Sequence, residues 1–150
     1  MLNWNFKHYS ELSRDEFHDL VALRIKVFVI EQNCPYQDLD GLDKVCYHLL
    51  TTNQKNEVVG TARIIPPGQL YPAAGIGRVV LDESVRGGNH GHELMKRCKQ
   101  FIFSIFVSYE IELSAQKHLE QYYNKHGFIS TGHEYEEDGI PHVKMIHTLK

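Results

Sequence analysis

The chain lacks the features that mark several large classes of protein. Its three cysteines lie far apart and form no Cys-x-x-Cys pair, which predicts free thiols in a reducing cytoplasm. No apolar run approaches the ~20 residues of a transmembrane helix, and the polar residues after Met1 argue against a signal peptide. The net charge of -3 and the absence of a long Lys/Arg run argue against nucleic acid as the main partner. We therefore expect a cytoplasmic protein that binds neither a membrane nor nucleic acid.

Metal-binding spacing is also missing. The sequence has ten histidines, but only His90 and His92 lie close together. There is no His-Glu-x-x-His motif and no clustered Cys/His pattern. We expect no metal.

Hydrophobic periodicity predicts the fold class. At 150 residues, 42% of them hydrophobic, the chain is long enough for one domain, residues 1–150, with a single core. Strands are expected at residues 4–9, 47–52, 57–65, 76–81, 109–115, 128–136 and 142–149. Helices are expected from the Ser13 cap to the Pro35 region, after residue 86, and over 118–126. This order predicts an α/β (α+β mixed) layered domain with a mixed sheet.

One glycine-rich turn stands out between a strand and a helix. Arg86-Gly87-Gly88-Asn89-His90-Gly91 follows an apolar, β-branched run and opens an amphipathic helical pattern. The first turn of a helix has free N–H groups and partial positive charge, glycines let a ligand approach the backbone, and Arg86 adds a donor fork. The stretch predicts a phosphate site, or else an ordinary turn that needs glycine for its geometry.

Two segments in the second half of the chain resemble the GNAT superfamily of acetyl-CoA-dependent N-acetyltransferases. Residues 79–91 resemble its pyrophosphate motif, Arg/Gln-x-x-Gly-x-Gly/Ala, and residues 116–128 resemble its Asn…Tyr-x-x-x-Gly-Phe segment. Asn89 replaces the usual middle glycine and Gln116 the usual asparagine; Asn tolerates left-handed backbone. Residues 27–38, 77–80 and 135–142 resemble the ElaA-like group of these proteins across nearly the whole chain.

The resemblance implies a GNAT-type acyl-CoA N-acyltransferase fold. Its twisted mixed sheet of about six to seven strands is flanked by helices and splayed between the fourth and fifth strands. Acetyl-CoA would be the cosubstrate, with its pantetheine arm in that gap. The implied CoA-binding residues are Val79, Val80, Leu81, Arg86, Gly87, Gly88, Asn89, His90, Gly91, His92, Gln116 and Tyr123.

The same resemblance suggests catalytic residues. Tyr123, four residues before Gly127, stands where the family has the tyrosine that protonates the CoA sulfur, although it could merely pack. Tyr122 is expected in the core. The candidate bases are Glu31, Glu136, His48 and His142; Glu31 closes the first helix beside the expected acceptor pocket, and His142 follows the Asp-Gly-Ile-Pro turn.

The sequence leaves alternatives for two arginines of the predicted strands and for the acids of the 36–43 loop. Arg63 or Arg78 could brace Glu31 or an acidic loop residue. The loop acids could attract a cationic amine or simply keep the loop solvated; they are Asp38, Asp40 and Asp43.

The leading functional hypothesis is acetyl transfer from acetyl-CoA to a primary amine of a small molecule or peptide, by direct attack on the thioester. One alternative is a non-catalytic acyl-CoA-binding sensor or interaction module. Another is an acyltransferase like the acyl-homoserine-lactone synthases, which the Arg24-x-x-Val27-Phe28-Val29 region also resembles. A homodimer is expected only from the frequency of such assemblies.

Overall fold

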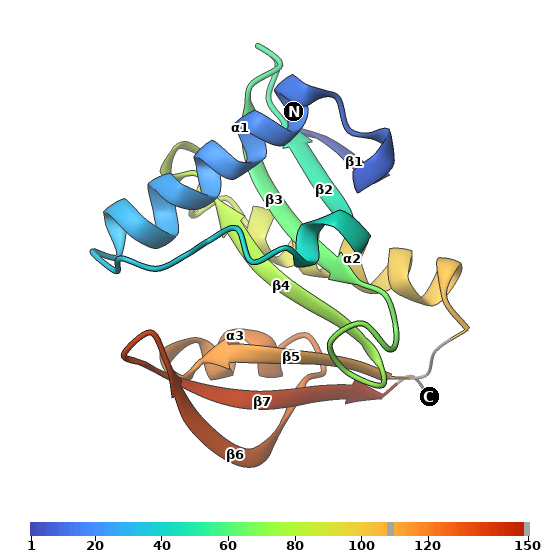
Figure 1. Cartoon of the computed structure of the whole chain (residues 1–150), viewed down its shortest axis with the longest axis vertical. Helices are drawn as coiled ribbons and strands as arrows, with labels where there is room; N and C mark the ends of the chain where they lie inside the picture. Colours follow the sequence, from blue (N-terminus) through green and yellow to red (C-terminus); the bar gives the residue numbers. More distant parts are fainter. Residues whose placement is uncertain (108–109, 149–150) are drawn as a thin grey trace.

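The computed structural model describes residues 1–107 and 110–148. Along the chain its main elements alternate as the sequence predicts: one strand, a helix, three strands, a helix, a strand, a helix and two strands (Figure 1). They are β1 (Asn3–His8), α1 (Arg14–Arg24), β2 (Tyr47–Thr52), β3 (Val58–Ile65), β4 (Ala74–Leu81), α2 (His90–Ile105), β5 (Glu110–Gln116), α3 (Glu120–Asn124), β6 (Ile129–Glu137) and β7 (Ile140–Thr148). The expected strand ends at residues 109 and 149 lie outside the described residues.

The seven strands form one sheet in the order β1-β2-β3-β4-β5-β7-β6. Neighbouring strands are antiparallel except β4 and β5, which are parallel and joined through α2. This mixed sheet with flanking helices confirms the predicted fold class.

Two apolar layers hold the helices on opposite faces of the sheet (Figure 1). On one face, α1 and its extension pack Leu23 and Val27 against Val80. On the other, α2 and α3 enclose the larger core, to which α2 contributes a stripe of buried residues at spacings of three and four: Leu94, Met95, Cys98 and Ile102. Helices thus cover both faces of the sheet around β3 and β4, whereas no helix covers the α1 side of β5, β7 and β6 in the described chain.

Local sequence explains where α1 begins and ends. Ser13 accepts a hydrogen bond from the Glu16 N–H while Glu16 reaches back to the Ser13 N–H, the predicted capping box. The helix continues through Ile25–Glu31 as wider π-type turns, with the Gln32 N–H bonded to the Val27 carbonyl. It stops at Asn33, which is left-handed, before the Pro35 segment as predicted.

Two predicted helices differ in detail. A 3-10 turn, Glu83–Val85, separates β4 from the glycine-rich stretch, so α2 begins only at His90. The helix expected over 118–126 is a 3-10 turn, Lys117–Leu119, followed by the short α3. Gly127 ends α3 with a φ of +87°, a left-handed conformation that glycine adopts without strain. Among the described residues, no helix is long and apolar enough to span a membrane.

Candidate active site

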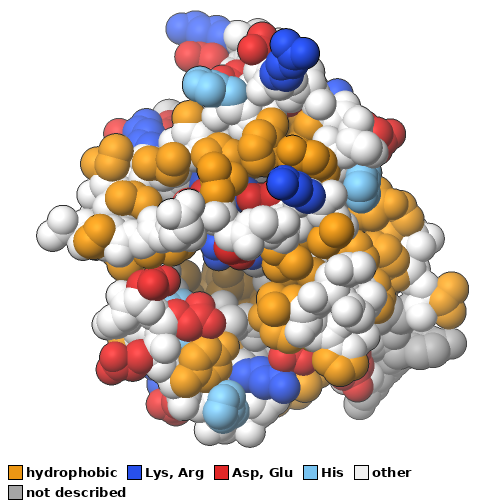
Figure 2. All heavy atoms as spheres, viewed as in Figure 1, with side chains coloured by type: hydrophobic (Ala, Val, Ile, Leu, Met, Phe, Trp, Pro, Cys, Tyr) orange, Lys and Arg blue, Asp and Glu red, His pale blue; other side chains and the backbone are white. Residues whose placement is uncertain are grey.

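A cleft opens where β4 and β5 part. Within the described residues, the two parallel strands pair only at Ala74 with Ile111 and at Gly75 with Glu112, and beyond these pairs they diverge. The gap holds a cavity of about 910 Å³ between the end of the α1 extension, β4, β5 and the β6–β7 hairpin. Figure 2 shows the molecule hollowed at this place. The predicted splay between the fourth and fifth strands is therefore confirmed.

A bulge in β4 shapes one wall of the cleft. Arg63 pairs with Gly77 and Thr61 with Val80, so Arg78 and Val79 together face the single residue Ala62. Arg78 has a φ of +51°, which re-aims its side chain. The strand edge after Gly75 has no β5 partner, so it can accept an extended ligand as an added strand.

The predicted phosphate stretch lies beside this edge. Gly87 has a φ of +83° and Asn89 a φ of +66°, so asparagine does hold the left-handed conformation expected of it. In the described part of the chain, no acceptor is found for the backbone N–H groups of Gly87, Gly88 and Asn89. The first turn of α2, from His90 to His92, adds N–H groups at its positive end. The arrangement suits a phosphate anion.

Arg86 braces this stretch and does not point freely at a ligand. Its Nε donates to the Leu81 carbonyl at 2.9 Å, and its Nη2 donates to Glu31 Oε1 at 3.0 Å. The ion pair ties the end of the π-type turns to the stretch from Gly87 to His92, which we call the cradle. Glu31 thus sits next to the phosphate stretch, with one oxygen engaged by Arg86.

Two neighbouring tyrosines of α3 face different parts of the site. The Tyr122 ring packs against the core as expected, and its hydroxyl in addition donates to the Gly91 carbonyl at 2.6 Å. Tyr123 is 8% exposed and lines the cavity, and burial raises the pKa of its hydroxyl. Among the described residues, no hydrogen-bond partner is found for that hydroxyl, and it stays protonated at neutral pH.

His92 lies against His126 of the segment after α3. His92 Nδ1 lies 2.8 Å from His126 Nε2, and burial together with His92 and Lys99 lowers the pKa of His126 to about 4. Within residues 1–107 and 110–148, no group of three His, Cys, Asp or Glu side chains could hold a metal ion. The pair instead packs against Tyr122 beneath the cradle.

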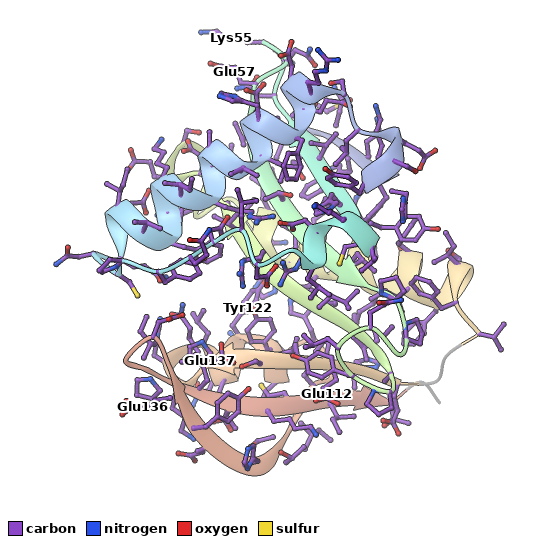
Figure 3. All side chains as sticks on the ribbon, viewed as in Figure 1. Lys55, Glu57, Glu112, Tyr122, Glu136 and Glu137 are labelled. Atoms are coloured by element: carbon purple, nitrogen blue, oxygen red, sulfur yellow. The ribbon has the colours of Figure 1, made fainter. Side chains whose placement is uncertain are left out.

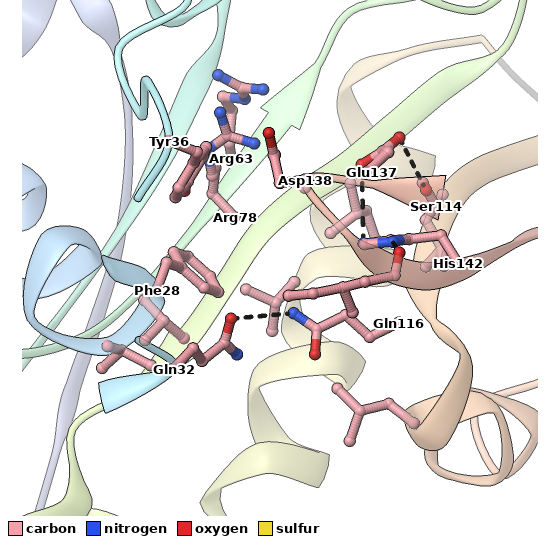
Figure 4. A pocket seen from close by; sticks show the side chains of 18 of the residues that line it. Phe28, Gln32, Tyr36, Arg63, Arg78, Ser114, Gln116, Glu137, Asp138 and His142 are labelled. Carbon is pink, nitrogen blue, oxygen red and sulfur yellow. Dashed lines mark hydrogen bonds and ion pairs between the residues drawn. The ribbon is translucent and has the colours of Figure 1, made fainter. Parts of the chain in front are cut away.

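His142 faces the cavity from the start of β7. It is 9% exposed, and its Nδ1–H donates to the Ile140 carbonyl at 2.7 Å. A carbonyl can only accept, so this bond fixes the tautomer and leaves Nε2 as the nitrogen with a lone pair. Nε2 lies 3.7 Å from Glu137 Oε2, and Figure 4 shows the two side chains together in the cavity.

Glu137, which the sequence reasoning missed, replaces Glu136 at the site. Glu137 lines the cavity and accepts from the Ser114 hydroxyl at 3.3 Å, while Ser114 accepts from Tyr135. Glu136 is exposed and does not line the cavity, since successive residues of a strand face opposite sides (Figure 3). A strict alternation from Tyr135, which shares a face with Glu137, is the signal that could have found it.

Of two other residues named from the sequence, His48 lies away from the cavity and Gln116 lines it. His48 is fully buried outside the cavity, its Nε2–H donates to the Asp43 carbonyl, and burial lowers its pKa. It is not placed to act as a base. Gln116 lies in the cavity, where its amide donates to Gln32 across the cleft at 3.3 Å (Figure 4).

The acidic loop is held by arginines, which corrects the idea that its acids attract an amine. Arg24, at 1% exposure, bonds both Asp38 and Asp43. Arg63 bonds Asp40, and the bulged Arg78 bonds Asp38, so neither arginine braces Glu31. No contact with the loop was predicted for Arg24, although it lies four residues after Leu20 and so shares the buried face of α1.

Comparison with known proteins agrees with this geometry. The sequence matches the Acetyltransferase (GNAT) domain family over residues 14–149. It is 40% identical to the protein ElaA of Escherichia coli over 97% of this chain and 95% of that one. The crystal structure of ElaA superposes with a TM-score of 0.90, at 39% identity over 98% and 99% of the two chains. An acyl-CoA N-acyltransferase structure from Pseudomonas aeruginosa gives 0.93, at 37% identity over 99% and 100%.

The splayed sheet, the cradle and these matches define an acyltransferase. The chain belongs to the GNAT acetyltransferase family, and within it the chain is similar to ElaA.

Proposed function

We propose that the protein transfers an acetyl group from acetyl-CoA to a primary amine of a small molecule or peptide. The observation that carries the proposal is the continuity of three features: the N–H groups of residues 87–89, which find no acceptor in the described chain, with the first turn of α2; the open edge of β4; and a cavity that Tyr123 and His142 both line. An anion, an extended amide-bearing arm and a thioester would meet these features in that order.

The N–H groups from Gly87 to His92 would hold the pyrophosphate, with Arg86 and Tyr122 keeping the cradle in shape. Backbone groups of Val79 to Leu81 would bond the pantetheine arm. Because the Leu81 carbonyl already accepts from Arg86, Val79 and the remaining backbone groups would carry that contact. Gln116, beside the cleft, would meet the arm from β5.

Transfer requires a neutral amine, which attacks the thioester carbonyl carbon; a C–N bond forms and the C–S bond breaks. His142 Nε2, whose lone pair is left unused by the Nδ1 bond to Ile140, would take the ammonium proton. Tyr123 is a protonated hydroxyl in the same cavity and would give its proton to the departing thiolate. Glu31 is less suited to act as base because Arg86 engages it at 3.0 Å.

Calorimetric titration with acetyl-CoA and with CoA tests the cofactor site. Asn89→Asp places a carboxylate in the cradle and should weaken binding about tenfold or more through repulsion of the pyrophosphate. Asn56→Asp is a matched control, because Asn56 is also a left-handed, exposed asparagine but lies in the β2–β3 turn. No binding of either nucleotide to the wild type would contradict the proposal.

A thiol-release assay over a panel of amines then tests the chemistry. Tyr123→Phe should bind acetyl-CoA as the wild type does and lower kcat about 100-fold, the low end of the range for a general acid. An unchanged kcat would remove Tyr123 from the mechanism. Binding of acetyl-CoA with no turnover of any amine would favour an acyl-CoA-binding sensor.

A further inference from the structure

The arginines around the cavity already have carboxylate partners within the chain. Three arginines line it, and each guanidinium is already bonded to a carboxylate of the chain: Arg63 to Asp40, Arg78 to Asp38, and Arg86 to Glu31. The loop acids and Glu31 are neutralised by the same bonds. The charge that remains for a ligand therefore comes from other lining residues.

Two lining acids, Glu137 and Asp138, have no lysine or arginine partner among the described residues, and of these Glu137 is held in place by its neighbours. Its side chain is 49% exposed at the cavity, and in residues 1–107 and 110–148 it has no lysine or arginine partner. The Ser114 hydroxyl and the His142 ring fix its position, as the dashed lines of Figure 4 show. The carboxylate thus faces the cavity in a defined orientation with acceptor capacity to spare.

His142 adds an acceptor next to this carboxylate. Most of the side chain is buried, but its Nε2 is open to the cavity and, within the described residues, lies 3.7 Å from Glu137 without a hydrogen bond. With its lone pair unused, this nitrogen can accept a hydrogen bond from a ligand in the cavity. An ammonium group has three N–H donors and no acceptor, which suits a carboxylate and an imidazole lone pair side by side.

Resting on the proposed function, we infer that Glu137 binds the ammonium group of the acceptor, and that the acceptor is a primary amine without a carboxylate on the adjacent carbon. His142 then receives one proton of the ammonium group that Glu137 holds. A free α-amino acid would bring its carboxylate within several ångströms of Glu137, where like charges repel, while the charge of each lining arginine is already balanced by a carboxylate of the chain.

Matched pairs of ligands test this substrate class. Phenylalanine with phenylalaninol, and leucine with leucinol, differ only in the exchange of the carboxylate for a hydroxymethyl group, and all four carry an ammonium group near neutral pH. Each is titrated calorimetrically into CoA-saturated wild type, Glu137→Gln and Glu136→Gln. Glu136 is the control, since it is the neighbouring exposed carboxylate outside the cavity.

The wild type should bind each amino alcohol at least tenfold more tightly than its amino acid. Glu137→Gln should weaken amino-alcohol binding about tenfold, whereas Glu136→Gln should leave it unchanged. Equal binding within each pair, no binding of any of the four, or equal effects of the two substitutions would overturn the inference. Thiol release is measured in parallel: selective binding with no turnover would refute only the proposed function.

Discussion

Replacing Arg24 with methionine probes the largest buried charge network of the protein. Arg24 Nε bonds Asp38 at 2.9 Å, and its Nη1 and Nη2 bond the two oxygens of Asp43 at 2.8 and 3.0 Å. All three side chains are buried. Methionine keeps much of the apolar stem but leaves two carboxylates with less compensation.

Removing one partner of a buried ion pair typically costs ~3–5 kcal/mol. Asp38 keeps Arg78 and the Tyr36 hydroxyl, whereas Asp43 keeps two longer contacts among the described residues, 3.4 Å to Arg63 and 4.0 Å to His48. We therefore expect a loss of about 3 kcal/mol in the free energy of unfolding. At ~2–4 °C per kcal/mol for a chain of this size, the melting temperature should fall by roughly 6–12 °C.

Urea denaturation followed by circular dichroism measures the loss. Arg97→Met is the control, because its pair with Glu93 is half-exposed on the surface of α2, and it should cost only about 1 kcal/mol or less. A variant of Arg24 that stays within about 1 kcal/mol of the wild type would refute the reasoning.

The pH dependence supplies a second check. Burial raises the pKa of Asp43, but the hydrogen bonds and charge of Arg24 outweigh it and hold that pKa below its usual value. A lowered pKa stabilises the fold above the unfolded value near ~3.9, and this stability is lost as the pH falls through the folded pKa. Without Arg24, burial raises the pKa instead, so the variant gains stability on acidification. The difference between the two proteins should narrow from pH 7 to about 4.

Two further substitutions test the cradle. Tyr122→Phe removes the bond to the Gly91 carbonyl, worth about 1 kcal/mol, and should weaken CoA binding about fivefold in calorimetry; unchanged affinity would show that Tyr122 does not support the cradle. Asn89→Gly should keep the urea midpoint of the wild type, while Asn89→Val should lose about 1–3 kcal/mol because a β-branched residue is strained at a φ of +66°. Equal midpoints of these two variants would mean that the left-handed conformation is not held in solution.

Features with a local cause could be predicted from the sequence. The capping box of Ser13 and Glu16, the helix end before Pro35 and the left-handed Asn89 each follow from the residue and its neighbours. The order of strands and helices follows from periodicity in the same way.

Features that depend on pairing across the fold could not be read from the sequence. The acids of the 36–43 loop look solvated until the sheet brings Arg63 and Arg78 beneath them. At the site, alternation along β6 puts Tyr135 and Glu137 on one face, but only the pairing of β6 with β7 and of β7 with β5 brings that face to the cavity. The sequence offered no such pairing, so Glu136 was named and Glu137 was missed.

The two sets of charges in the cleft differ in what they leave for a ligand. In the loop, arginines and aspartates bond one another in buried, short contacts, so their fields largely cancel at the cavity. At the β6–β7 hairpin, Glu137 is held by a hydroxyl and an imidazole, neither of which cancels a negative charge while the imidazole is neutral. The loop therefore gives one wall of the cavity its shape, and the β6–β7 hairpin gives the cavity its negative charge. Substitutions in the hairpin should then change which amine is accepted, whereas substitutions in the loop should first change stability.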